Sequence, residues 1–125
     1  MDVKEKLKYT KDHEWVSLDG NIATVGITDF AQSELGDIVY VEVDTLDETL
    51  AKDEVFGTVE AVKTVSDLFL PMSGKIVEFN DNLSDAPESI NESPYDQGWI
   101  IKVDISNPDE INELLNSNDY SDLIG

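Results

Sequence analysis

The sequence predicts a mainly β fold, a flattened β-sandwich, with a short helix in the first third of the chain and a second helix near the C-terminus. Two observations favour this class. Most apolar residues lie in short runs rich in valine and isoleucine, separated by turn residues. In addition, the motif at residues 36–41 returns at residues 74–79, each time followed by a polar loop and a second apolar run. Two such units, each covering the apolar face of the other, would form the layers of a sandwich.

The N-terminal part predicts a hairpin over residues 14–27, followed by a short helix near residues 28–35. The hairpin consists of two runs rich in β-branched residues around a turn that contains glycine. Thr28 or Asp29 can cap the start of the helix, and Gly36 can end it with a positive φ.

The middle of the chain predicts further strands and a second hairpin over residues 55–79. Residues 80–98 contain Pro87 and Pro94 and are expected to form a long loop. The expected strands are 38–43, 55–61, 75–79 and 99–105.

The C-terminal part predicts a helix over residues 108–117. Asn107 can cap it, Pro108 suits its first position, and the two acidic residues that follow favour the positive end of the helix dipole. Its apolar stripe would be Ile111, Leu114 and Leu115.

Composition limits both size and function. A chain of 125 residues fits one domain, residues 1–125. Its 28 acidic residues against 8 lysines give a net charge of −20, which disfavours nucleic acid and anionic membranes as partners. The charge indicates a solvated surface or docking onto basic partners. With no secretory or transit signal at the N-terminus, we expect a cytoplasmic protein in a bacterium, or a mitochondrial matrix protein if this is a mature eukaryotic chain.

Few residues are suited to unaided catalysis. The chain has no cysteine, no phosphate-binding glycine loop and one histidine, His13, which lies beside Glu14. A histidine next to a carboxylate can act as a base or bind a metal. Because a metal site needs three or four ligands and there is no second histidine, we expect no metal and favour a structural or surface role for His13.

Lys63 lies between two apolar runs of the 55–79 hairpin, so it is expected at the hairpin tip, projecting into solvent. No Gly-Asn type turn signal surrounds it, so tertiary contacts must hold the turn. An exposed lysine is most often a solubilising charge. A protruding amine is also what an acylating enzyme needs to reach.

Several motifs together carry a resemblance. The chain reads Gly-Thr-Val-Glu-Ala-Val-Lys-Thr-Val-Ser-Asp at 57–67, His-Glu-Trp at 13–15 and Ser-Pro-Tyr at 93–95. In these and neighbouring segments it resembles the glycine cleavage system H protein family, in order and over nearly the whole chain. The segments are 8–16, 25–32, 35–39, 57–67, 71–80 and 90–99.

The resemblance implies a single lipoyl-carrier domain with the sandwich of lipoyl and biotinyl carriers (a barrel-sandwich hybrid), in which 55–79 is the lipoyl hairpin. It implies a carrier without catalytic residues, bearing lipoic acid in amide linkage on Lys63. In the family the arm takes an aminomethyl group from the pyridoxal-phosphate glycine decarboxylase (P protein) to the tetrahydrofolate-dependent aminomethyltransferase (T protein). Dihydrolipoyl dehydrogenase (L protein) then reoxidises it, and a lipoate-attaching enzyme is a further partner.

The resemblance also implies a surface cleft near residues 13–15 that shelters the loaded arm. Our hypothesis is that Glu14 or Asp67 pairs with the cationic amine there, with His13 nearby. Glu60 and Asp67 flank Lys63; they either guide the lipoylating enzyme or only solubilise the tip.

Three other interpretations stay open on the sequence. Lipoyl domains of 2-oxoacid dehydrogenases and biotin carriers share the hairpin, but biotinyl sites usually have methionine on both sides of the lysine, where this chain has Val62 and Thr64. An H-like lipoate relay, which donates lipoyl groups to other lipoyl enzymes, could look nearly the same. An acidic interaction domain with an unmodified Lys63 is the third.

Overall fold

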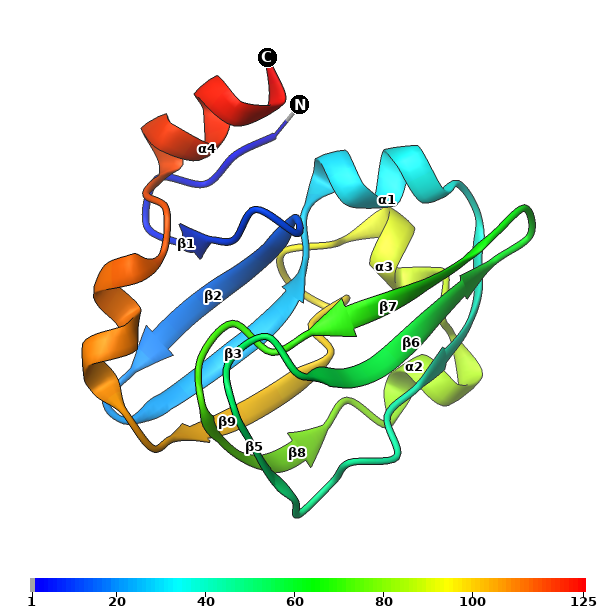
Figure 1. Ribbon diagram of the computed structural model, residues 1–125. Helices are drawn as coiled ribbons and strands as arrows, with labels where there is room; N and C mark the ends of the chain where they lie inside the picture. Colours follow the sequence, from blue (N-terminus) through cyan, green and yellow to red (C-terminus); the bar gives the residue numbers. More distant parts are fainter. Residues whose placement is uncertain (1) are drawn as a thin grey trace.

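The computed structural model describes residues 2–125 and confirms a mainly β fold, built from two antiparallel sheets that form a flattened sandwich (Figure 1). One sheet has the strand order β1-β2-β3-β9-β8-β5, and the other has the order β4-β6-β7. The strands are β1 (Lys8–Tyr9), β2 (Glu14–Asp19), β3 (Ile22–Ile27), β4 (Ile38–Glu42), β5 (Thr49–Leu50), β6 (Val55–Ala61), β7 (Val65–Phe69), β8 (Gly74–Phe79) and β9 (Ile101–Ile105).

The main apolar core lies between the two sheets. Val25 and Val103 enter it from the six-stranded sheet, and Val41 and Val59 enter it from the three-stranded sheet. All four side chains are buried, so the core joins both layers. A second, smaller cluster joins the N-terminal strands to the C-terminal segment and contains Tyr9, Trp15 and Tyr120.

The repeated motif forms the same local structure twice. β4 pairs with β6 and β8 pairs with β9, and in each pair the register shifts at the same point of the motif. The shift leaves Val39 of the first copy and Val77 of the second between paired residues, where each is exposed. The repeat seen in the sequence is therefore two bulged strand pairs, one in each sheet.

The N-terminal hairpin consists of β2 and β3, paired from Glu14 opposite Ile27 to the turn. Helix α1 (Asp29–Leu35) follows, and Thr28 is its cap, because its side chain accepts a hydrogen bond from the Ala31 N–H. Gly36 ends the helix at φ +81°, which agrees with the expected positive φ.

The segment 80–98 departs from the expected long loop, because it contains two one-turn helices, α2 (Asn82–Asp85) and α3 (Ser89–Glu92). Each buries one apolar side chain, Leu83 or Ile90, in the main core. Helices of four residues are too short to show a periodic apolar pattern, so hydrophobic periodicity could not predict them.

The predicted C-terminal helix begins at Pro108 as expected, but it does not run on to residue 117. Asn107 does cap a helix there, but it is a 3₁₀ helix, η1 (Pro108–Glu113), and a separate helix, α4 (Ser117–Ile124), follows. The break arises because Leu115 exchanges two backbone hydrogen bonds with Tyr9, both 2.8 Å, which requires an extended chain between the helices. Within residues 2–125, no helix is long and apolar enough to cross a membrane.

Candidate functional site

Lys63 lies at the tip of the β6–β7 hairpin, which projects beyond the rest of the molecule (Figure 1). The strands pair as far as Glu60 opposite Val65. Beyond them the Ala61 N–H donates to the Thr64 carbonyl at 2.7 Å, and the Lys63 side chain is exposed. The amine is thus open to a macromolecular partner.

The hairpin tip rests on the turn between α1 and β4. The Val62 N–H donates to the Asp37 carbonyl at 3.0 Å, which is a tertiary contact of the kind that the missing turn signal predicted. The Lys63 side chain lies across Gly36, since a Cβ atom on that glycine would be 3.4 Å from Lys63 Cε and 3.8 Å from Nζ. A Cβ atom there would make ordinary van der Waals contact with the lysine, and it is the φ of +81° that disfavours a side chain at position 36.

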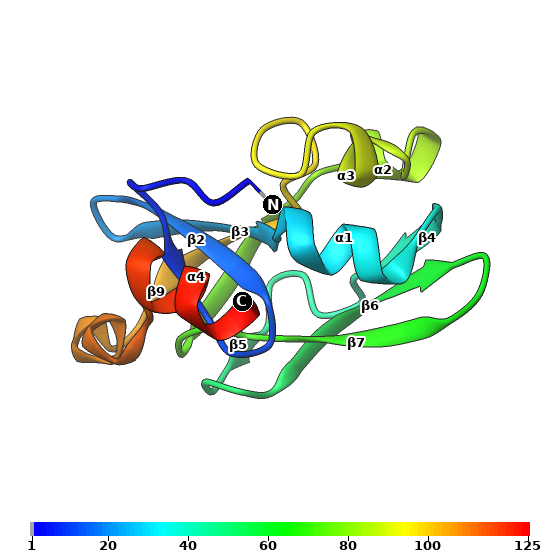
Figure 2. The same cartoon turned by 90° about the horizontal axis from the view of Figure 1, so that it is seen from above.

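A cleft of about 150 Å³ lies beside the hairpin and is lined by residues of α1, β7 and the loop before β2. Figure 2 shows helix α1 lying next to the β6–β7 hairpin. It brings together three of the predicted site residues, His13, Glu14 and Asp67, but not Glu60 or Lys63. Its lining combines an apolar part with carboxylates. The apolar residues are Ile27, Ala31, Leu35, Val59 and Leu68, and the acidic residues are Asp12, Glu14, Glu34 and Asp67.

Glu14 is the deepest carboxylate of this cleft, with 2% of its surface exposed. Its Oε1 accepts from the Thr10 hydroxyl at 3.1 Å, and its Oε2 accepts from the Phe69 N–H at 2.8 Å. Burial nevertheless raises the pKa of Glu14 to about 8, because the two hydrogen bonds offset only part of the desolvation and Asp12 and Asp53 add negative charge. At neutral pH the Glu14 carboxyl is therefore mostly protonated.

His13 is held in place by the C-terminal helix. Its Nδ1 lies 2.9 Å from the hydroxyl of Tyr120, which also lies 2.7 Å from the Thr28 hydroxyl. Its ring packs on Phe30 at a centroid distance of 4.8 Å, and burial lowers the pKa of the imidazole. Neutral His13 therefore forms part of the cleft wall and links it to α4.

The two acids that flank Lys63 differ in position. Glu60 is exposed on β6, opposite Tyr40 and Val65, and lies outside the cleft. Asp67 is exposed too, but it lines the cleft rim. Of these two acids, only Asp67 is both a residue of the hairpin and part of the cleft lining.

Sequence reasoning missed three polar residues of the cleft, Asp12, Glu34 and Ser66. A partial signal existed for Glu34, because it lies three residues after Ala31 and hence on the same face of α1. Asp12 and Ser66 come from a loop and a strand, and only the tertiary structure places them there.

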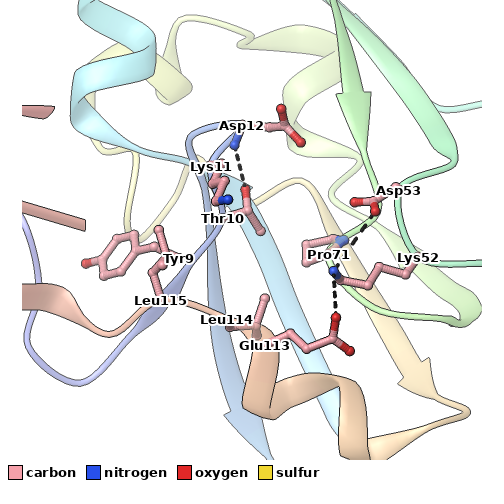
Figure 3. A pocket seen from close by; sticks show the side chains of 10 residues that line it. All are labelled: Tyr9, Thr10, Lys11, Asp12, Lys52, Asp53, Pro71, Glu113, Leu114 and Leu115. Carbon is pink, nitrogen blue, oxygen red and sulfur yellow. Dashed lines mark hydrogen bonds and ion pairs between the residues drawn. The ribbon is translucent and has the colours of Figure 1, made fainter. Parts of the chain in front are cut away.

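A larger hollow, about 480 Å³, lies between the chain around Tyr9 and the C-terminal segment (Figure 3). Lys52 is part of its lining, and its Nζ lies 3.4 Å from Glu113 Oε1 and 4.0 Å from Asp53 Oδ2. It contains neither the hairpin tip nor any residue of α1. Lys52 thus joins the segment before β6 to the C-terminal segment, which is typical of a junction between chain segments.

Comparisons with known proteins agree with one another. The profile described as "Glycine cleavage H-protein" matches residues 7–125. Two relatives named glycine cleavage system H protein, from two strains of Staphylococcus epidermidis, are 53% and 52% identical over 125 residues, covering 100% of this chain and 99% of each relative. The chain belongs to the glycine cleavage H-protein family.

A solved structure supports the same assignment. The crystal structure of a glycine cleavage system H protein from Mycobacterium marinum superposes with a TM-score of 0.90 at 38% identity, covering 98% of this chain and 99% of that one. As a member of the family, the chain is a carrier component of the glycine cleavage system and not a catalyst. The family is known to bear lipoyl groups.

Proposed function

We propose that this H protein carries lipoic acid on Lys63 and moves the aminomethyl group from the P protein to the T protein, after which the L protein reoxidises it. The observation that carries the proposal is the exposed amine at the tip of a projecting hairpin, beside a cleft with apolar and acidic walls. A carrier of this kind raises the effective concentration of one group at several active sites.

Acylation of Lys63 requires its neutral amine. The Nζ lone pair attacks the carbonyl carbon of an activated lipoyl donor, an acyl adenylate or a thioester. The new C–N amide bond forms as the bond from that carbon to the leaving group breaks, and one amine proton passes to a base or to water. The product has lost the positive charge of the lysine.

The cleft suits both parts of a loaded arm. When attached, the dithiolane supplies the sulfur that accepts the one-carbon group and the disulfide that is reduced and reformed. Leu35 and Leu68 offer it apolar surface, and the carboxylates around them suit a protonated amine. Contact with these walls would keep water from the cargo.

We propose Glu14 as the main partner of that amine, with Asp67 at the rim. A proton occupies the Glu14 carboxyl in most of the molecules at neutral pH, since its pKa is raised to about 8. Arrival of a cation favours the ionised carboxylate, and the proton leaves for water. The Phe69 N–H and the Thr10 hydroxyl hold the two oxygens in place during this change.

The lifetime of the loaded arm tests this role. Glu14→Ala should shorten it by about tenfold or more, in line with the loss of a partly buried charged contact. Spontaneous release of ammonia from loaded protein measures the lifetime. Glu60→Ala removes the same charge outside the cleft and should leave the lifetime unchanged; an unchanged lifetime in Glu14→Ala would reject the role of Glu14.

We also propose that the acidic surface of the chain, whose formal net charge is −20, steers it toward basic surfaces on its partner enzymes. Glu60 lies within this surface, next to the tip that the lipoate-attaching enzyme must read. Exposed charges of this kind mainly raise association rates, so their effect should weaken with salt.

Reconstitution tests the function as a whole. Enzymatically lipoylated chain should support glycine-dependent formation of NADH with the P, T and L proteins, tetrahydrofolate and NAD⁺, whereas the unmodified chain should not. Failure of the lipoylated chain, or success of the unmodified one, would contradict the proposal. A lipoate relay would instead fail here and pass its lipoyl group to an unmodified 2-oxoacid dehydrogenase domain when a lipoyl transferase is supplied. The cation-binding cleft favours the shuttle.

A further inference from the structure

The tip of the lysine hairpin, residues 61–64, has little to hold it from within. Inside the tip, one backbone hydrogen bond joins Ala61 to Thr64, and Val62 is 75% exposed. Its other support comes from residues 36–38, through the Val62 N–H bond to the Asp37 carbonyl and the pairing of Ala61 with Ile38. The position of Lys63 therefore depends on where the 36–38 turn lies.

That turn is fixed from its other side by Asn91 of α3. Asn91 Oδ1 accepts from the Ile38 N–H at 2.9 Å, and its Nδ2 donates to the Gly36 carbonyl at 2.9 Å and to Gln32 Oε1 at 3.0 Å. One half-buried side chain thus joins the end of α1, the turn and the start of β4. On the opposite side, the turn carries the Lys63 side chain.

We propose that Asn91 is a positioning residue for the acylation of Lys63. It holds the 36–38 turn, and through that turn the hairpin tip, so that the amine meets the activated lipoyl donor in a constant orientation. The lipoate-attaching enzyme then reads a composite surface, the tip together with the turn. This inference rests on the proposed function, because it assumes that Lys63 is acylated.

The size of the effect follows from the chemistry of amide formation. Attack on a carbonyl needs the amine at a defined distance and direction, and a displacement of about 1 Å can cost up to about a hundredfold in rate. Asn91→Asp keeps the acceptor for Ile38 N–H but places an oxygen against the Gly36 carbonyl, which cannot donate. The turn must then move away from α3.

Asn80 provides a matched control. Its Nδ2 donates to two carbonyls, of Gln97 and Trp99, at 2.9 and 2.8 Å, and its Oδ1 accepts from the Asn82 N–H at 3.3 Å. Asn80→Asp adds the same charge and likewise removes an Nδ2 that donates twice and keeps an Oδ1 that accepts once. Asn80 is buried whereas Asn91 is half-buried, so Asn80→Asp should destabilise the fold at least as much. The Asn80 side chain makes no hydrogen bond to residues 36–38 or 61–64, so Asn80→Asp reports only a general loss of stability.

The experiment measures kcat/KM for lipoylation of the full unmodified chain by a lipoate–protein ligase with lipoate and ATP, read by intact mass. We expect Asn91→Asp to lower kcat/KM by about tenfold or more, within the range that misorientation produces. Asn80→Asp should keep a kcat/KM close to that of the unsubstituted chain, although we expect thermal unfolding to show it destabilised at least as much as Asn91→Asp.

Equal rates for Asn91→Asp and Asn80→Asp would overturn the inference. If Asn91→Asp does not fold, Asn91→Ser replaces it, with hydrogen exchange of the Val62 amide as a second readout. Faster exchange at Val62 together with slower lipoylation supports the role; unchanged exchange and rate overturn it. Absence of lipoylation in the unsubstituted chain would instead overturn the proposed function, and this inference with it.

Discussion

The motif that begins at Gly36 and the motif that begins at Gly74 form the same bulged strand pair in different surroundings. In each, the strand that follows the glycine pairs with a later strand, so that Ile38 lies opposite Ala61 in one copy and Ile76 lies opposite Val103 in the other. The Gly74 copy stays paired for two more residues, to Ile105 opposite Gly74. In the Gly36 copy the pairing ends at Ala61, and the Val62 N–H donates to the Asp37 carbonyl.

The residues beyond the matched strand pairs differ between the two copies. After Ser106 comes Asn107, which caps η1, and Glu110 of that helix accepts hydrogen bonds from the backbone and side chain of Ser73. After Val62 comes Lys63, which remains exposed. Helix η1 therefore packs against the end of the Gly74 copy, whereas no helix packs against Lys63 at the end of the Gly36 copy, and its amine is exposed. In this molecule the repeated unit presents a reactive group where the covering helix is missing.

The largest effect is expected for Lys63→Arg. A guanidinium stays protonated and does not accept an acyl group, so lipoylation and glycine-dependent NADH formation should both be lost. Lys75→Arg makes the same change at an exposed lysine of the Gly74 copy and should preserve both. Intact mass after ligase treatment measures the first effect. A fully lipoylated Lys63→Arg would show that another amine is the acceptor.

The next largest effect is expected for the pH dependence of the free energy of unfolding, and it comes from Glu14 in the cleft beside the β6–β7 hairpin. Folding raises the pKa of Glu14 from 4.5 to about 8, so in this window the folded state holds a proton that the unfolded chain has lost. The free energy of unfolding should therefore fall as pH rises, by up to about 1.4 kcal/mol per pH unit.

Glu14→Gln has no such proton, so its unfolding free energy should fall less over the same window. Urea unfolding of the unmodified chain at several pH values measures the difference. Glu60→Gln, at an exposed acid of the β6–β7 hairpin, should follow the unsubstituted chain. Parallel curves for the Glu14→Gln variant and the unsubstituted chain would contradict the burial cost assigned to Glu14.

Stability should respond equally in the two copies. A Cβ atom on Gly57 would overlap the Glu42 carbonyl oxygen, and one on Gly74 would overlap that of Asp104. Gly57→Ala and Gly74→Ala should each cost about 1–3 kcal/mol, because backbone must move to admit the methyl group. Thermal or urea unfolding checks this, and a neutral result at either site would show that the strand pairs can shift cheaply.

The smallest effect is expected at the bulges. Val39 and Val77 are the exposed residues where the registers shift. Val39→Thr and Val77→Thr should each change the free energy of unfolding by less than about 0.5 kcal/mol, as is usual for exposed positions. A loss above about 1 kcal/mol at one site alone would indicate a contact that the other copy lacks.

Local signals made much of this predictable. Thr28 before an apolar stretch, the glycine turn near residue 20 and the two apolar runs around Lys63 each act over a few residues. The sequence thus predicted the hairpins, the first helix and the exposed lysine. The twofold motif predicted the layers of the sandwich.

Long-range contacts determined the rest. The bonds between Leu115 and Tyr9 break the expected C-terminal helix, and no local pattern reports them. The burial of Glu14 comes from α1 and β7 packing around it, so its raised pKa was equally hidden. Asn91 looks like an ordinary loop residue until its three bonds to α1 and β4 are seen.

Whether Lys63 carries the lipoyl group is tested most directly on the protein isolated from its native cell. Intact mass shows whether the chain is modified, and peptide mapping shows where. We predict a mass increase equal to one lipoyl amide, located on the peptide that contains Lys63. An unmodified Lys63 in a cell that lipoylates its other lipoyl proteins would contradict it.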